Sequence, residues 1–341
     1  MKIDFFVNKS IDELVKVNVE YLPYTFLKTY KDFVQSNYGS EIVIALAKEE
    51  NVFVAFSRHK SKFILNAQLL SEPFTDKGVL AIDKQAHFFE ELALALKQQN
   101  TADRLITPQN FVVLGGVPKN SFSCKFGSYV VDLTPSIEEM YAKVNSKHRN
   151  KINKAERAGV EIRTGKEELH TFYKLYNETM KRSNMYCEPF DFFNSLYTHL
   201  GETNCICTVV YHNGEPQGAI LAPFTKYCCY YVYGASSSNI TESGSINYLH
   251  WKTMLLLKDE GVKLYDFVGA RLSDVSNTKL EGIQSFKERF GGPLKKGYLF
   301  KMDINQTKCK VFDSMLSISN KVKRRKAFKD IIDQEIEKQS S

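Results

Sequence analysis

Hydrophobic and polar residues alternate along two parts of the chain as β-strands require. Residues 41–70 (EIVIALAKEENVFVAFSRHKSKFILNAQLL) place β-branched runs between polar turns, which predicts two or three antiparallel strands. Residues 205–212 and 215–224 flank Asn213–Gly214, a strong hairpin signal because type I′ turns need positive φ. A third strand is predicted directly afterwards, over residues 227–235.

Apolar residues at helical spacing predict helices around these strands. Ser136 and Glu139 form an S-x-x-E capping box, so we expect a helix from there to Ala158, with a second start at Asn145–Ser146 and a left-handed stop at Gly159. Further helices are predicted over residues 21–36, 85–99, 167–182, 247–259 and 281–290.

The order of elements in the second half predicts an α+β fold with a mixed sheet. Two helices precede three meandering strands, and then a helix, a strand (263–270), a helix and a last strand (294–304) follow. This order is similar to that of the GNAT acyltransferase core, and the first half is compatible with a more diverged copy. We therefore expect two GNAT-like domains, 1–133 and 134–305, followed by a basic helical tail, 306–341.

Composition places the chain among ordinary globular proteins. Its 341 residues suggest two domains, and 43% hydrophobic with 25% charged residues exclude collagen-like and largely disordered classes. The 46 Lys and Arg against 39 Asp and Glu give a net charge of +7, which is compatible with a phosphate-bearing ligand but too low for a dedicated nucleic-acid coat.

Several absences predict a cytoplasmic protein without a bound metal. Charges interrupt the first residues, so we expect no signal-peptide core, and no apolar run of about 18 residues predicts a membrane span. The seven cysteines include no C-x-x-C pair and indicate reduced thiols. Cys205 and Cys207 alternate with Val209 and Tyr211, which is the pattern of a buried sheet face rather than of a zinc site.

Lys287 is the first candidate for chemistry. It lies four residues after Ile283 and three before Phe290, inside a predicted apolar stripe that also contains Phe286. A lysine in that position extends its ammonium to solvent, finds a partner in the protein, or serves a substrate. A functional lysine would stabilise developing negative charge.

A basic segment over residues 143–157 is the second candidate. Lys147, Lys151 and Lys154 share a helix face, while Ile152 and Ala155 are expected to point to the core. With Lys147 and Arg149 beside a helix start near Ser146, the segment predicts an anion site, and a solvated charged face is the alternative.

Two further groups and the tail could contact a ligand. Alternation places Tyr231 and Tyr233 on one side of the third strand, where GNAT folds open a cofactor cleft, although core packing also explains strand tyrosines. Arg182 and Tyr186 follow a long helix, where an arginine also interacts favourably with the helix dipole. Residues 321–329 carry six positive charges, typical of a solvated amphipathic helix, with tRNA or an anionic membrane as further partners.

Five segments together resemble the Fem family, FemABX-like aminoacyltransferases of two GNAT-type domains that add amino acids to peptidoglycan precursors. The segments are SKHRNKINKAERAGVEI, YYVYGASS, LHW, GVKLYDFVGA and GIQSFKERFGG. The resemblance is specific from about Ser136 to Ile304. Before that it is looser: TFLKTYKDF is similar to the family's precursor-binding segment, which usually has tryptophan where this chain has Tyr30.

The resemblance implies that a precursor amine attacks the ester of an aminoacyl-tRNA. Phe286 and Lys287 match a pair near the reaction centre, where the lysine stabilises the oxyanion, and Lys28, Arg182 and Tyr186 would hold the precursor's phosphates. It implies no tightly bound cofactor, aminoacyl-tRNA as co-substrate, and a nucleotide- or lipid-linked cell-wall precursor as partner. Peripheral contact with the inner membrane surface is a further expectation.

Two departures from the family keep other functions open. Only residues 183–204 separate the long helix from the next strand, so the helical hairpin arm of some members is not expected. The loop SSSNITESG lacks the Q/R-x-x-G-x-G/A pattern that binds the acyl-CoA pyrophosphate, which argues against acetyl-CoA as donor. The alternatives are an acyl-CoA-dependent N-acyltransferase acting on an amino sugar, sugar nucleotide or lipid, and a non-catalytic module that binds anionic glycans or RNA.

Overall fold

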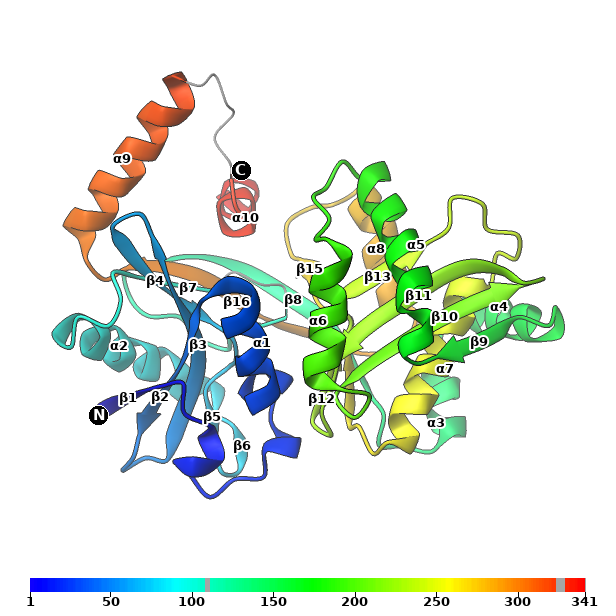
Figure 1. Ribbon diagram of the computed structural model, residues 1–341, viewed down its shortest axis with the longest axis horizontal. Helices are drawn as coiled ribbons and strands as arrows, with labels where there is room; N and C mark the ends of the chain where they lie inside the picture. Colours follow the sequence, from blue (N-terminus) through cyan, green and yellow to red (C-terminus); the bar gives the residue numbers. More distant parts are fainter. Residues whose placement is uncertain (108–110, 323–328, 341) are drawn as a thin grey trace.

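The computed structural model describes residues 1–107, 111–322 and 329–340, with the side chains of 320–322 not described. Two halves lie side by side (Figure 1), one formed by the first part of the chain and the other by its middle part. Of the basic run predicted over residues 321–329, residues 323–328 lie outside the described residues. Within the described ranges, no helix is both long and apolar enough to cross a membrane.

The larger sheet has twelve strands and contains most of the first half. The first four strands of the chain pair antiparallel with one another. Helix α2 (Ile82–Gln98) covers one face of these strands with Phe88, Phe89 and Leu92. The main path runs β1 (Ile3–Val7), β2 (Glu41–Ala47), β3 (Val52–Ser61), β4 (Ile64–Leu69), β7 (Arg104–Ile106), β16 (Leu294–Asp303), β8 (Phe122–Asp132), β14 (Leu264–Asp266) and β12 (Cys228–Tyr230), with β5 (Phe74–Thr75), β6 (Gly78–Val79) and β15 (Ala270–Arg271) beside it.

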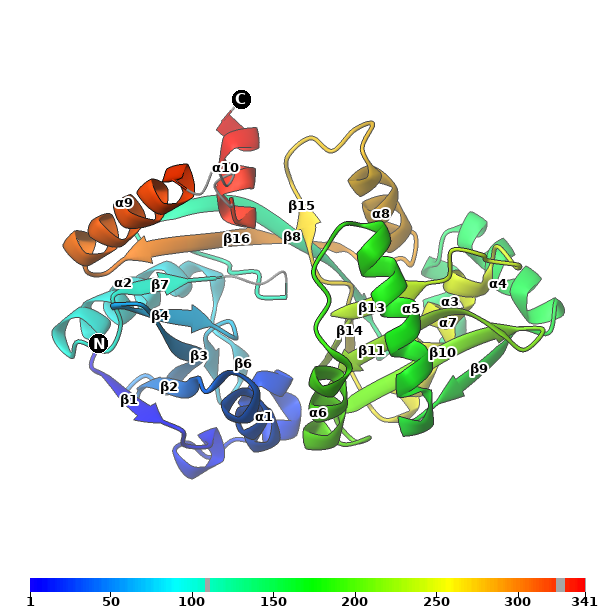
Figure 2. The same cartoon turned by 45° about the horizontal axis from the view of Figure 1, so that its top comes forward.

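Strands β8 and β16 extend from one half toward the other (Figure 2). β16 pairs with β8 over Leu294–Lys301 and with β7 over Lys301–Asp303. A strand from the range predicted as the second domain thus completes the sheet of the first half. The domain limits 1–133, 134–305 and 306–341 stay a prediction, since the hydrogen bonding crosses the first of them.

The smaller sheet of the second half is antiparallel, and its two central strands are buried on both faces. Its order is β13 (Tyr233–Ser236), β11 (Glu215–Pro223), β10 (Cys205–His212) and β9 (Glu161–Thr164). Cys205, Cys207, Val209 and Tyr211 share one buried face, as the alternation predicted. The helices α5 (Leu169–Arg182) and α6 (Phe190–Leu200) cover that face, and α4 (Ser146–Arg157) and α7 (Ser245–Asp259) cover the other.

One hydrophobic core joins the two halves. Helix α1 (Lys28–Tyr38) packs against β2 through Phe33 and against α6 through Phe192, with ring centroids of Phe33 and Phe192 5.3 Å apart. Alternation along β2 divides its side chains between this core and the α2 side. The arrangement of the halves is therefore fixed by packing as well as by shared strands.

Local signals in the sequence predicted many of the elements. The capping box at Ser136 begins α3 (Ile137–Lys143), and Asn145 caps α4, so the break within the 136–158 helix is confirmed. Asn213 and Gly214 have φ of 53° and 78°, as the hairpin requires. The helix predicted over 21–36 instead starts as 3-10 turns at Val19–Tyr21 and Tyr24–Phe26 before α1; further 3-10 turns are Ile11–Glu13 and Lys166–Glu168.

The predicted third strand, 227–235, is two strands in different sheets. Its first part, β12, runs parallel to β14, and its second part, β13, pairs with β11. Tyr231 and Val232 lie between them, where the two sheets separate. The expectation that Tyr231 and Tyr233 lie on one side of a strand is therefore wrong: Tyr231 packs on the α4 and α7 side and Tyr233 on the α5 and α6 side. The remaining helices are α8 (Lys279–Glu288), α9 (Gln306–Val322) and α10 (Ile331–Ser340).

Candidate active site

Tyr231 fills the space where β12 and β13 separate. Its ring stacks on Tyr265, with centroids 6.5 Å apart, and meets the edge of His250 at 4.6 Å. A Cβ at position 234 would lie 1.8 Å from the Tyr231 hydroxyl, so Gly234 is required by the position of this ring. The cleft expected at this point is therefore closed by an aromatic side chain, and burial raises the pKa of Tyr231 to about 12.

A strained turn follows β14. Val268 has a φ of 41°, a left-handed conformation that is costly for a β-branched residue, and Gly269 follows with a φ of 67°. The carboxylate of Asp266 accepts a hydrogen bond from the Val268 N–H at 2.8 Å and another from the Ser128 hydroxyl. Asp266 is buried, and that burial raises its pKa to about 6. These contacts fix the direction of the turn's carbonyl groups.

The ammonium of Lys287 binds those carbonyl groups. It donates to the Gly269 oxygen at 2.9 Å and also to the Val268 oxygen. Because an ammonium has three N–H donors, one remains without a partner among the described residues. Burial lowers the pKa of Lys287 to about 8, against an opposing effect of Asp266. The site thus holds a positioned, partly desolvated cation with a donor to spare.

Phe286 and two histidines pack around this lysine. His148 lies 3.1 Å from the Phe286 carbonyl through Nε2, and the ring of Phe286 is 5.4 Å from that of His250. Burial lowers the pKa of His148 to about 4 and that of His250 to about 3, so both rings are neutral at physiological pH. They position α8 against α4 and α7 rather than carry a proton.

The sequence analysis did not identify these histidines, although the spacing of His148 indicates that it is buried. His148 lies four residues before Ile152 and seven before Ala155, and all three are buried on one face of α4. The expectation for Ile283 is wrong: it is 40% exposed, because α8 contacts the body through its C-terminal part.

Tyr30 and Tyr233 come together in a cavity of about 510 Å³ between the halves. Its lining is largely aromatic, with polar groups from β3 that include His59 and Lys60. Tyr30 lies edge-on to Tyr24, with ring centroids 4.9 Å apart, and burial raises the pKa of Tyr30. Lys28 is exposed at the start of α1. Lys287 is not among the residues that line this cavity.

Arg182 is the last residue of α5, and Tyr186 lies four residues after it. The Arg182 guanidinium donates to the Ser236 carbonyl at 2.6 Å, which ties α5 to β13. Tyr186 is 78% exposed, and its hydroxyl donates to Glu188 at 3.4 Å. The negative charge of Glu188 raises the pKa of Tyr186. These contacts leave other parts of both side chains available, so the ligand role of both residues stays a prediction.

The basic face of α4 is solvent-exposed, but Arg149 is already engaged. Its guanidinium donates to the carbonyls of Ala142 at 3.0 Å and Val144 at 2.6 Å, satisfying the end of α3. Lys147 is exposed, and Asn145 caps its backbone N–H at 3.0 Å. The anion role of Lys147 and Arg149 remains a prediction.

The N-terminus of α7 is occupied by groups of the protein itself. Glu242 accepts the Gly244 N–H at 3.0 Å and pairs with Lys154 at 3.2 Å. A Cβ at Gly244 would lie 2.2 Å from the Lys151 carbonyl, which shows how closely α4 covers this end. A carboxylate thus stands in the loop where the GNAT pattern would bind a pyrophosphate.

Comparison with known proteins identifies the fold. Residues 142–280 match a family model described as an acetyltransferase (GNAT) domain. The structure of FemX superposes with a TM-score of 0.67 at 13% identity, covering 91% of this chain and 99% of that one. The C-terminal domain (DUF2156) of a proposed lysylphosphatidylglycerol synthetase from Agrobacterium fabrum superposes with a TM-score of 0.50 at 15% identity, covering 80% and 88%. No curated sequence matches the chain.

These findings confirm the predicted fold. The chain has the FemX-like architecture of two GNAT-like units with a mixed sheet, and its second half carries an acyltransferase-type domain.

Proposed function

We propose that this protein is an aminoacyltransferase that moves an aminoacyl group from aminoacyl-tRNA to an amine of a phosphate-bearing peptidoglycan precursor. The observation that carries the proposal is the Lys287 ammonium, which is held by the Val268–Gly269 turn with one N–H left to donate. The FemX-like architecture supports the reaction class.

The reaction needs no group beyond the two substrates and this site. The acceptor nitrogen attacks the ester carbonyl carbon and forms a C–N bond, and the carbonyl oxygen becomes an oxyanion. The free N–H of Lys287 donates to that oxyanion, which lowers the barrier because the charge develops in a partly desolvated position. The C–O bond to the tRNA ribose then breaks, the ribose oxygen takes the proton released by the amine, and an amide remains.

Two features of the second half argue against acyl-CoA as the donor. Tyr231 fills the separation of β12 and β13, and Glu242 accepts the Gly244 N–H just before α7. An incoming diphosphate would meet that carboxylate at close range and be repelled by it. An aminoacyl ester presented from outside the sheet needs neither the gap that Tyr231 fills nor the N–H group that Glu242 occupies.

The cavity between the halves is the proposed acceptor site. Tyr30 and Tyr233 line it. Lys28, Arg182 and Tyr186, which are not among the lining residues, are the residues proposed to contact the phosphates. A lipid headgroup is the second candidate acceptor, since the largely aromatic lining suits a ligand with apolar surface and the A. fabrum domain comes from a proposed lysylphosphatidylglycerol synthetase.

The test is a transfer assay with a mixture of radiolabelled aminoacyl-tRNAs and either nucleotide-linked or lipid-linked precursor. We expect label in the precursor, and at least a hundredfold loss of rate with Lys287→Met, as for removal of one oxyanion donor. Lys296→Met, at an exposed position, is the control for loss of a positive charge. Full activity of Lys287→Met would remove the catalytic assignment, and tight acetyl-CoA binding by calorimetry would overturn the proposed donor.

A further inference from the structure

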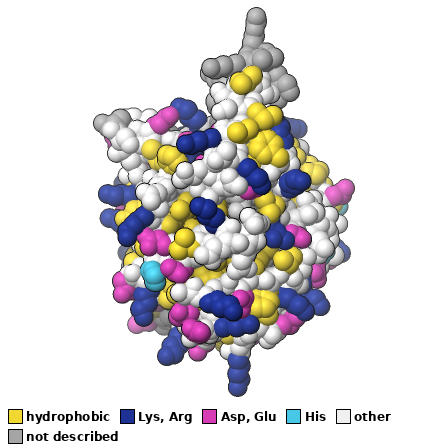
Figure 3. Space-filling model, turned by 90° about the vertical axis from the view of Figure 1, so that its left-hand side faces the viewer, with side chains coloured by type: hydrophobic (Ala, Val, Ile, Leu, Met, Phe, Trp, Pro, Cys, Tyr) yellow, Lys and Arg dark blue, Asp and Glu magenta, His cyan; other side chains and the backbone are white. Residues whose placement is uncertain are grey.

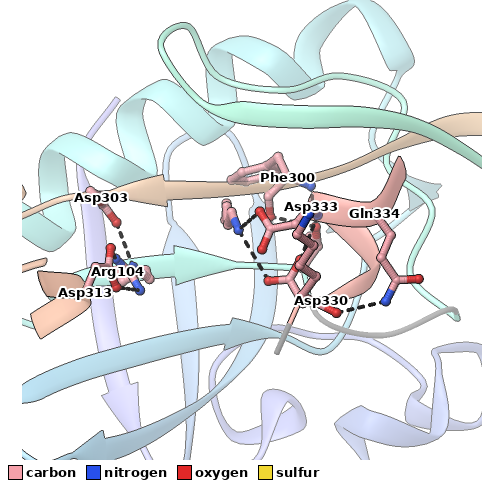
Figure 4. Close-up of polar contacts among 10 residues, drawn as sticks. Arg104, Phe300, Asp303, Asp313, Asp330, Asp333 and Gln334 are labelled. Carbon is pink, nitrogen blue, oxygen red and sulfur yellow. Dashed lines mark hydrogen bonds and ion pairs between the residues drawn. The ribbon is translucent and has the colours of Figure 1, made fainter. Parts of the chain in front are cut away.

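Helix α9 rises from the end of β16 away from the first sheet (Figure 1). Its base is firmly attached: Arg104 donates to Asp303 at 2.6 Å and to Asp313 at 2.7 Å (Figure 4), and Phe312 meets Phe63 with ring centroids 5.8 Å apart. The neighbouring α10 is held separately, by the contacts of Asp330 and Asp333 with Lys301. The helix therefore has a defined direction relative to the body.

An apolar stripe on α9 is left exposed. Val311, Met315 and Ile318 are spaced four and three residues apart, so they share one face, and they are 50%, 45% and 62% exposed. The attachment uses a different face, where Cys309 and Phe312 are buried. Figure 3 views this side, with hydrophobic side chains gathered below the grey segment and lysine or arginine side chains near them. Contiguous exposed apolar surface of this kind marks an interaction site.

The chain next to the stripe is strongly basic. Residues 321–329 contain six lysines and arginines, although 323–328 lie outside the described residues. Lys310 on α9 itself is exposed. An amphipathic helix next to a cluster of cations is the combination that anionic lipid surfaces attract, because apolar insertion and attraction to headgroup phosphates add together.

Two hollows of the protein share one lining residue, Lys60. A hollow of about 770 Å³ at the base of α9 is lined by Lys60, Lys97 and Lys308, among others. Lys60 also lines the 510 Å³ cavity that contains Tyr30 and Tyr233.

We propose that α9 docks the protein on an anionic lipid surface, with Val311, Met315 and Ile318 inserted among the headgroups. The proposal goes beyond the transfer reaction and does not depend on it, since docking concerns the end of the chain and not Lys287. A second copy of this chain and a nucleic acid are the other partners that a basic amphipathic helix could take, and both are outcomes of the test.

The test measures partitioning of the full chain onto vesicles of phosphatidylcholine alone and of equimolar phosphatidylcholine and phosphatidylglycerol. The main variant, Met315→Glu/Ile318→Glu, places two charges in the stripe. The matched control, Gln306→Glu/Ser317→Glu, adds the same charge at exposed positions on the opposite face, where the two residues lie three turns apart. Thermal unfolding of both variants shows that the fold is retained.

Binding to the phosphatidylglycerol vesicles should exceed binding to the neutral ones. The stripe variant should lower the partition coefficient about tenfold or more, whereas the control should lower it less than about threefold, since it changes only the long-range attraction. Equal losses in the two variants, or no vesicle binding by the wild type, would overturn the proposal. So would concentration-dependent dimers in light scattering that the stripe variant abolishes, or loss of tRNA binding by that variant with vesicle binding intact.

Discussion

Replacing Lys287 by methionine should stabilise the fold near neutral pH while it removes transfer. Burial lowers the pKa of Lys287 from 10.5 to about 8. Since each pH unit corresponds to about 1.4 kcal/mol, the charged side chain costs the folded state ~3 kcal/mol. Methionine is uncharged and of similar length, but it leaves the carbonyls of Val268 and Gly269 without a donor, at roughly 1 kcal/mol each. We therefore expect a net gain of about 1 kcal/mol at pH 7.

The pH dependence gives the sharper test. Below pH 8 the lysine is protonated in both the folded and the unfolded protein, so the full cost is present. Between about pH 8 and pH 10.5 the unfolded chain binds a proton that the folded protein has released, so the stability of the wild type rises with pH relative to the variant. By pH 10 the advantage of Lys287→Met should have shrunk by about 2 kcal/mol and changed sign.

The assay is urea denaturation at pH 7 and pH 10, followed by circular dichroism and by the fluorescence of Trp251, the single tryptophan. Lys296→Met, at an exposed position, is the control, and its difference from the wild type should be the same at both pH values. A Lys287→Met difference that is equally flat would show that the ammonium is solvated in the folded protein. The proposed desolvated oxyanion donor would then lose its physical basis.

Four further changes test the surroundings of the site. Val268→Asn should raise the free energy of unfolding by about 1 kcal/mol in thermal denaturation, because asparagine tolerates a φ of 41°, and a lower melting temperature would contradict the strain. Gly234→Ala should cost roughly 1–3 kcal/mol by overlapping Tyr231, and less in a Tyr231→Ala background; additive losses in a double-mutant cycle would refute the contact. The pKa of Asp266 is raised from 3.8 to about 6, so between these pH values the folded protein holds a proton that the unfolded chain has released. As the pH rises from 4 to 6, the stability of the wild type relative to Asp266→Asn should therefore fall by up to ~3 kcal/mol in urea denaturation. A constant difference would contradict burial. Arg149→Ala should destabilise the protein by about 1–2 kcal/mol and leave substrate affinity unchanged if the guanidinium only caps α3, whereas a raised KM would reveal the ligand contact predicted from the sequence.

Local features of the sequence predicted local features of the fold. The capping box at Ser136 and the hairpin at Asn213–Gly214 depend on side chains and φ angles within a few residues, so the sequence was enough to predict them. Helix α6 was missed, although its buried residues Phe192, Phe193, Leu196, Tyr197 and Leu200 recur at helical spacing on one face.

The parts that escaped prediction depend on distant segments. That β16 would complete the first sheet, or that residues 227–235 would divide between two sheets, follows from pairing partners far along the chain. The environment of Lys287 was likewise foreseen only in part: its burial came from the apolar stripe, but the carbonyl groups that hold it come from a turn nineteen positions earlier.

The pairing of β16 also bears on how the chain folds during synthesis. Strands β7 and β8, from the first half, are joined through β16, which ends at Asp303. The edges of β7 and β8 that pair with β16 therefore stay unpaired until Asp303 has left the ribosome. A growing chain holds an open sheet edge for that time, which is the condition in which strands pair wrongly with other chains. Truncation before Asp303 would leave the first half with the same open edge permanently.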